Sequence, residues 1–125
     1  MPGSAKRVLR IDPATGATSL VGDCRGDFVG NALKGKQFKW LRCVAARGAI
    51  YGVPCNAHHA LKLTPSTGAV EAMKAYAGPD GRARPNAALL GTWKYHGAVL
   101  APNGDVYCIP SNAARARRAP SRARG

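Results

Sequence analysis

The sequence predicts an all-β protein built from duplicated β-hairpins, and two internal repeats predict it. The segment GAIYGVPCNA at 48–57 returns as GDVYCIPSNA at 104–113, and VLRIDPATGATSLVG at 8–22 returns as ALKLTPSTGAVEAMK at 60–74. In each repeat, short apolar runs flank a turn that ends in Gly, which is typical of a β-hairpin. No long apolar stripe of helical period occurs, which argues against a helical fold.

The first hairpin unit, which we call hairpin A, is expected at residues 37–57 and 92–113. In the second copy the turn PNG at 102–104 separates two apolar runs. Pro presets φ in such a turn, and Asn-Gly tolerates positive φ. The first copy has one residue fewer before its turn, which we expect at 46–48.

The second unit, hairpin B, is expected at residues 8–22 and 60–74. Its turn reads DPATG in one copy and TPSTG in the other. Asp or Thr can bond the turn backbone, Pro sets its first dihedral and Gly ends it, so the second turn is expected at 65–68.

The apolar positions of the repeated strands are the predicted core. Because side chains alternate along a strand, Val106 and Cys108 should share one face while Tyr107 and Ile109 share the other. The predicted buried set is Leu9, Ile11, Val44, Ile50, Leu61, Leu63, Val99, Val106 and Ile109.

Together, A and B supply four short strands in just over 50 residues. Four strands per repeat of roughly 40–50 residues is typical of a β-propeller blade. A small sandwich or barrel that arose by duplication is the alternative. We therefore expect one repeat region at 1–113 with about two blades, followed by an Arg-rich tail at 114–125.

The repeats also resemble known propeller blades. The G-x-[IV]-Y strand of hairpin A and the V-x-x-I-D-x-x-T-G pair of hairpin B are similar to those of kelch-type, NHL-type and gluconolactonase/regucalcin-like propellers. The resemblance covers residues 6–113 and implies antiparallel blades. The double glycine of kelch repeats and the Trp-Asp ending of WD repeats are absent.

Two blades are fewer than a closed propeller requires, since such rings hold roughly four to eight. The chain is therefore expected to be a fragment or a decayed copy of a longer propeller. The alternative is a partial propeller that self-associates: hairpin B of one chain completes a blade with hairpin A of another, and three subunits close six blades.

The net charge of +13 is unevenly spread: the last eleven residues hold five arginines and no acid, and the rest of the chain carries the other +8. A segment of this composition cannot bury enough apolar surface to order itself, so we expect 114–125 to be disordered. Strong positive charge favours polyanions such as nucleic acid. The candidate polyanion-binding residues are Arg115, Arg117, Arg118, Arg122 and Arg124.

The beginning of the chain lacks the apolar segment of a secretory signal, and no run is long enough to cross a membrane. These features predict an intracellular, soluble protein, cytoplasmic or nuclear, whose thiols are reduced.

The densest group of metal-type ligands is Cys55, His58 and His59, a spacing that suits zinc. A fourth ligand is not apparent, and the second copy has Ser111 where the first has Cys55. Small buried thiols and surface imidazoles explain the group more simply. We expect no cofactor.

Asn56 and Asn112 recur at the end of the same strand. The resemblance to gluconolactonase-like propellers implies that Asn, Asp and Glu at strand ends ligate a central metal ion and act on a sugar lactone. The matching acids are missing here, since Asp12 becomes Thr64 in the other copy. The simpler interpretation is that each Asn satisfies the backbone of its turn.

Trp40 and Tyr95 are repeated aromatics next to Lys39 and Lys94, and such a pair could stack on bases. Repeated positions in a blade more often pack in the core. The sequence therefore predicts a noncatalytic propeller-type interaction module, with a protein partner or a second copy completing it. The alternatives are a lactonase-like hydrolase and nucleic-acid association through the tail.

Overall fold

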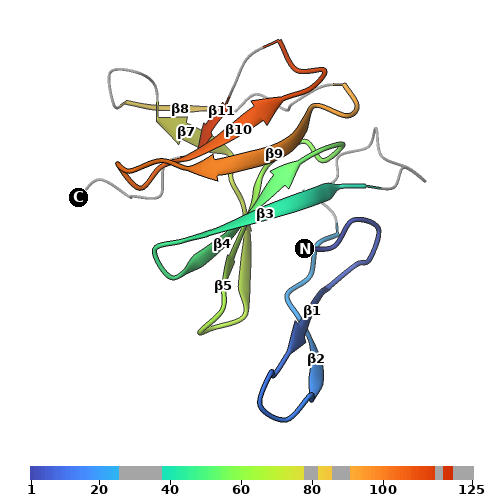
Figure 1. Cartoon of the computed structure of the whole chain (residues 1–125). Helices are drawn as coiled ribbons and strands as arrows, with labels where there is room; N and C mark the ends of the chain where they lie inside the picture. The colour runs from blue at the N-terminus through green and yellow to red at the C-terminus, as the bar shows by residue number, and fades with distance from the viewer. Residues whose placement is uncertain (26–37, 78–81, 86–90, 115–116, 120–125) are drawn as a thin grey trace.

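The computed structural model describes residues 1–25, 38–77, 82–85, 91–114 and 117–119 (Figure 1). In this part of the chain every sheet is antiparallel and there is no helix, which confirms the all-β class. The strands are β1 (Val8–Ile11), β2 (Thr18–Val21), β3 (Trp40–Ala46), β4 (Ala49–Pro54), β5 (Leu61–Thr64), β6 (Ala69–Ala72), β7 (Ala75–Ala77), β8 (Ala83–Pro85), β9 (Tyr95–Leu100), β10 (Val106–Pro110) and β11 (Arg117–Ala119).

Three sheets pack in a row through the body of the molecule (Figure 1). The central sheet has the order β3-β4-β5-β6. The first sheet, β1-β2, packs on one of its faces, where Val8 joins Trp40 and Leu61 in a buried cluster. The last sheet, β11-β10-β9, covers the opposite face, where Val106 joins Tyr51. Strands β7 and β8 pair only with each other among the described strands.

The two copies of hairpin B fold alike. Leu9 lies opposite Leu20 in the first sheet, and Leu61 lies opposite Ala72 in the central sheet, so both partners shift by 52 residues. The second turn lies where we expected it, because the Gly68 N–H donates to the Thr64 carbonyl at 2.9 Å and Gly68 has a φ of +72°.

The two copies of hairpin A also share their backbone hydrogen bonds. The N–H of Cys55 donates to the Lys39 carbonyl at 2.9 Å, and the N–H of Ser111 donates to the Lys94 carbonyl at 2.8 Å. The expected turns at 46–48 and 102–104 join β3 to β4 and β9 to β10. Hairpins A and B are thus repeats in structure as well as in sequence.

The expectation that 114–125 is disordered is wrong for three residues. Arg117–Ala119 form β11, which pairs with β10. Val106 lies opposite Ala119, just as Ile50 lies opposite Leu63, and both partners shift by 56 residues. A strand edge can recruit almost any sequence through backbone hydrogen bonds, and β11 uses the edge of β10 in this way. The remainder of the predicted disordered tail, apart from Ala114, lies outside the described residues.

The predicted core is correct in the middle of the stack and wrong at its ends. Leu61, Leu63 and Val106 are buried, while Val44 and Ile50 are half-buried. The exposed members of the predicted set are Leu9, Ile11, Val99 and Ile109. The reason is positional: these four side chains lie on the faces of the first and last sheets that point away from the central sheet.

Candidate functional site

The outward face of the first sheet is apolar and open. It carries Leu9, Ile11 and Leu20, all of which are exposed. Leu9 and Ile11 occupy the repeat positions of Leu61 and Leu63. Leu61 is 0% exposed because the first sheet covers it, whereas Leu9 is 58% exposed. The same position is therefore a core position in one sheet and a surface position in another.

The outward face of the last sheet is open in the same way. Ile109 occupies the repeat position of Val53; Val53 is 1% exposed and Ile109 is 51% exposed. Val99, also exposed, lies directly opposite the half-buried Tyr107, so both belong to this face. Val106 and Cys108 point to the central sheet and are buried, which confirms the predicted alternation along β10.

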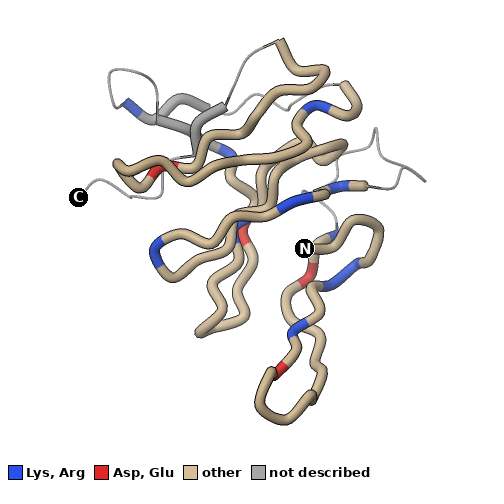
Figure 2. The backbone as a smooth tube through the Cα atoms, in the orientation of Figure 1, with Lys and Arg blue, Asp and Glu red and all other residues tan. Residues whose placement is uncertain are grey.

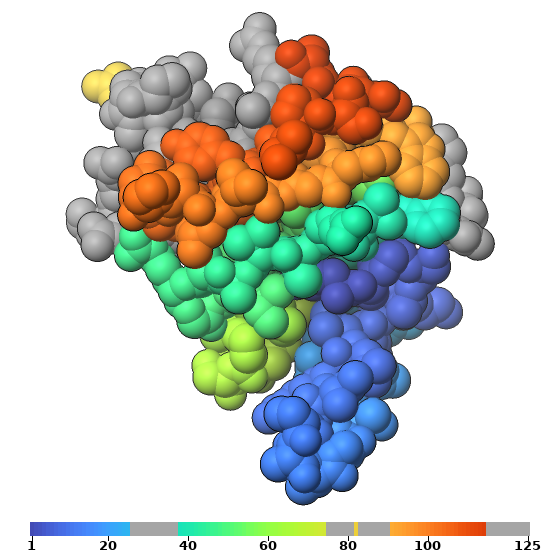
Figure 3. All heavy atoms as spheres, in the orientation of Figure 1, coloured from blue at the N-terminus to red at the C-terminus, as the bar shows by residue number. Residues whose placement is uncertain are grey.

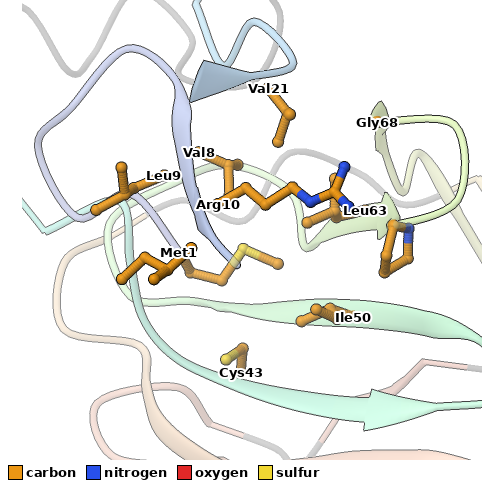
Figure 4. A pocket seen from close by; sticks show the side chains of 11 residues that line it. Met1, Val8, Leu9, Arg10, Val21, Cys43, Ile50, Leu63 and Gly68 are labelled. Carbon is orange, nitrogen blue, oxygen red and sulfur yellow. The ribbon is translucent and has the colours of Figure 1, made fainter. Parts of the chain in front are cut away.

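A cleft of about 310 Å³ lies between the first sheet and both hairpins of the central sheet. Cys43, Ile50 and Leu63 line one wall, and all four residues of β1 line the other (Figure 4). Cys43 is exposed and Ile50 is half-buried, although Val106, the repeat equivalent of Ile50, is buried. Within the described residues the first sheet contains a hairpin B but no hairpin A, so no hairpin A covers the face of β3 and β4 that carries Cys43 and Ile50.

One strand edge of the first sheet also lacks a partner strand among the described residues. In the central sheet β5 pairs with β4 on one edge and with β6 on the other. Its repeat equivalent β1 pairs only with β2 among the described strands. The N–H and C=O groups along its second edge are available to another strand.

Two residues proposed as ligand contacts are core residues. Trp40 and Tyr95 are both buried, and the Trp40 Nε1–H donates to the His59 carbonyl at 2.9 Å. They occupy equivalent positions at the start of β3 and β9. Their recurrence therefore reflects packing between sheets.

Asn56 and Asn112 have structural roles. The Oδ1 atom of the buried Asn56 accepts a hydrogen bond of 2.7 Å from the backbone N–H of Trp93, which ties the central sheet to the last sheet. Asn112 is exposed, and its Nδ2 donates to the Thr92 carbonyl at 3.4 Å. One member of the pair is thus a buried connector and the other a surface residue.

The remaining predicted sites gain no support from the geometry. Across the described ranges, no three His, Cys, Asp or Glu side chains come together as a metal site, and Cys55, His58 and His59 lie within those ranges. Burial raises the pKa of the Cys55 thiol. Of the five candidate arginines, Arg117 and Arg118 lie in β11, and the other three lie outside the described residues.

A pair of buried lysines was not expected from the sequence. The Nζ atoms of Lys39 and Lys94 donate to the carbonyls of Ala5 and Gly91, at 2.6 and 3.0 Å. Burial lowers the pKa of both side chains, that of Lys94 to about 8. From sequence alone, a lysine near the start of a hairpin is expected on the surface. Only the recurrence of Lys39-Trp40 as Lys94-Tyr95 could have indicated that the lysine is buried.

The sequence analysis also did not identify an exposed pair of aromatic residues that contact each other. Phe38 and Trp93 precede these lysines, and their ring centroids lie 5.3 Å apart. Both residues adopt positive φ, at +62° and +54°, which is rare for bulky side chains. His96 meets the Trp93 ring edge-on at 5.7 Å.

No helix in the described part of the chain is long and apolar enough to span a membrane. No protein-family model, curated protein or solved structure matches the chain.

Proposed function

We propose that this chain is a noncatalytic interaction module of propeller-type blades, which is completed by blade elements from a second copy. One observation carries the proposal. Repeat positions that are buried in the central sheet are exposed on the outward faces of the first and last sheets, as for Leu61 and Leu9 or Val53 and Ile109. Exposed contiguous apolar faces are typical of interaction surfaces.

The two faces differ, which determines the kind of assembly they support. One belongs to hairpin B at the start of the chain and the other to hairpin A near its end. Contacts between unlike faces are heterologous, and they generate rings when the rotation closes and filaments when it does not. Self-association of this kind would place each end of the stack against the opposite end of a neighbour.

The residue chemistry favours binding over the lactonase-type alternative. That reaction needs acidic ligands at strand ends, and Asp12 instead accepts a hydrogen bond from the N–H of Ala14 within its own turn. Asn56 is similarly engaged by the backbone of Trp93.

Analytical ultracentrifugation tests the proposal. The full chain should sediment above its monomer mass of 13.1 kDa, and Ile109→Lys should return it toward the monomer. Leu100→Lys is the matched control, because Leu100 is similarly exposed but lies opposite Val106, away from the Ile109 face. A strictly monomeric full chain would overturn the proposal.

A second candidate function is single-stranded nucleic-acid binding at the aromatic pair. Phe38 and Trp93 are exposed, and exposed basic residues occur in β3, at Arg42, and in the segment before β1, at Lys6 and Arg7 (Figure 2). Aromatic faces that stack on bases beside a basic surface are the usual arrangement of such sites.

Titration with a fluorescent single-stranded oligonucleotide at several salt concentrations tests this second candidate. Binding should weaken steeply with salt, and Trp93→Ala should weaken it at least about fivefold, consistent with the loss of about 1 kcal/mol of stacking. Equal binding by Trp93→Ala and the natural chain would remove the aromatic pair from consideration.

A further inference from the structure

We infer that β1 of a second copy pairs with β10 in the place that β11 holds, so that the joint sheet has the order β9-β10-β1-β2 with its last two strands from the neighbour. This inference rests on the proposed function and names the contact through which the copies join. It follows from three independent features: the register of β11, the open edge of β1 and the cleft between the first and central sheets.

The register shows that β10 is built to receive a hairpin B strand. In the central sheet β4 pairs with β5, with Tyr51 opposite Lys62. Strand β10 pairs with β11 in the same register, with Tyr107 opposite Arg118. Applying the repeat to β1 places Arg10 of the second copy opposite Tyr107, with Leu9 opposite Cys108 and Ile11 opposite Val106.

Strand β11 matches this place less well than β1 does. The central sheet has Leu61 and Leu63 at the two inward positions, and both are buried. Register places Arg117 and Ala119 of β11 at these positions, whereas β1 would supply Leu9 and Ile11. Leucine and isoleucine gain more free energy from an inward position than arginine and alanine do, so β1 is the better occupant.

The same contact covers the other open surfaces at once. In the joint sheet, the outward face with Val99 and Ile109 would lie over the wall formed by Cys43 and Ile50 of the second copy (Figure 4). That wall is the part of the central sheet that lacks a covering hairpin A. Leu9 of the second copy would in turn lie over hairpin B of the first copy's central sheet.

The surface view shows that both contributing ends are accessible. The first sheet projects from the body at one end of the molecule, and the last sheet forms the opposite end (Figure 3). Three large apolar side chains on the first sheet, Leu9, Ile11 and Leu20, are therefore exposed far from the last sheet of their own chain. Two copies can meet end to end without rearranging their central sheets.

Two local movements accompany docking. Strand β11 leaves the edge of β10, and Met1 gives way, since its side chain lies in the cleft (Figure 4). Residues at the start of the chain already occupy a repeat position: the Lys39 N–H donates to the Gly3 carbonyl at 2.7 Å, as the Lys94 N–H donates to the Cys55 carbonyl at 3.1 Å. On docking, the segment that follows Cys108 in one copy would therefore compete with Met1 and Gly3 of the other copy for the place beside Lys39.

Disulfide trapping tests the pairing directly. Chains carrying Arg10→Cys are mixed with chains carrying Tyr107→Cys, both in a Cys43→Ser background that removes the exposed native thiol. Mild oxidation should yield a covalent heterodimer, because register places the two new cysteines opposite each other. Ser19→Cys replaces Arg10→Cys in the control; Ser19 lies opposite Arg10 on β2, one strand farther from β10, and should give little product.

A variant of β11 gives a second test, in which self-association should become weaker. Arg117→Leu with Ala119→Leu restores the pattern of Leu61 and Leu63 within β11, so β11 should hold its place and self-association should weaken about tenfold or more. The control, Arg122→Leu with Ala123→Leu, makes the same change in charge and hydrophobicity beyond β11 and should not weaken association. If association were due to non-specific hydrophobic contact instead, both variants should associate more strongly.

The outcomes separate this inference from the proposed function. A heterodimer from Arg10→Cys and Tyr107→Cys, together with weaker association of the tail variant, supports the pairing. Self-association that depends on Ile109 but yields no more product with Arg10→Cys than with Ser19→Cys overturns the pairing and leaves the proposed function in place. A monomeric chain overturns both.

Discussion

The central sheet and the two outer sheets are made from the same repeats but differ in what their surfaces do. In the central sheet both faces of the repeat are used, one against the first sheet through Leu61 and the other against the last sheet through Val53. In the outer sheets the same positions carry Leu9 and Ile109, which are exposed. The difference teaches that a repeated apolar residue is a core residue only where a neighbouring sheet covers it.

The largest expected effect compares Leu61 with Leu9. Leu61→Ala should lower the free energy of unfolding by about 2–5 kcal/mol, because it removes a fully buried side chain. Leu9→Ala should change it by less than about 0.5 kcal/mol in the monomer, because Leu9 is on the surface. Urea denaturation of both variants measures the difference, and equal losses would show that Leu9 is buried within its own chain.

The next comparison lies within hairpin A of the last sheet. Val106 is buried against the central sheet and Val99 is exposed on the other face. Val106→Ala should lower the stability by about 1–3 kcal/mol and Val99→Ala by less than about 0.5 kcal/mol. The reverse order, measured by the same denaturation curves, would mean that the two faces of the last sheet have been exchanged.

The two repeated asparagines provide a smaller contrast. Asn56→Ala removes the acceptor of the Trp93 N–H and should lower the stability by about 1–2 kcal/mol. Asn112→Ala removes a longer surface hydrogen bond and should have an effect below about 0.5 kcal/mol. Thermal unfolding monitored by circular dichroism would measure both; a similar loss at the two positions would contradict the connector role of Asn56.

The smallest expected effect is a pH dependence due to Lys94. Burial lowers its pKa from 10.5 to about 8 in the folded chain. Above about pH 8 the unfolded chain therefore binds more protons than the folded chain, so stability should rise from pH 8 toward pH 9. Above the ordinary thiol pKa of 9.0 the raised pKa values of Cys24 and Cys55 act in the opposite direction, which confines the test to this window.

Lys94→Met should flatten the rise in stability between pH 8 and pH 9, as measured by urea denaturation at each pH. Lys74→Met is the control, because Lys74 is exposed. An unchanged slope in Lys94→Met would assign the pH dependence to another group.

The repeats made the class, the hairpins and their turns predictable, because alternation and Pro-x-x-Gly or Asn-Gly turns depend on local sequence. The exposure of Leu9 and Ile109 was not predictable, since it depends on which sheets lie next to each other. Strand β11 was missed for the opposite reason. Its sequence RRA has no strand pattern, and it pairs through the backbone edge that β10 offers.

The candidate site was predictable only in part. The repeat predicted an incomplete set of hairpins, but it did not indicate where the open surface would lie. Asn56 was selected as a candidate ligand contact because it recurs as Asn112. In the structure its side chain instead connects the central sheet to the last sheet. The aromatic pair of Phe38 and Trp93 was not selected. Both residues adopt positive φ before their strands begin, and the alternation of a hairpin does not indicate whether such residues are exposed.

Sedimentation equilibrium of the full chain across a range of concentration and salt tests the central claim, that the outer sheets are matching halves of one blade. Because each copy has a net charge of +13, salt should screen their repulsion and strengthen the association. We predict a mass above 13.1 kDa that increases with concentration and with salt. A mass that remains at 13.1 kDa under all of these conditions would contradict the claim.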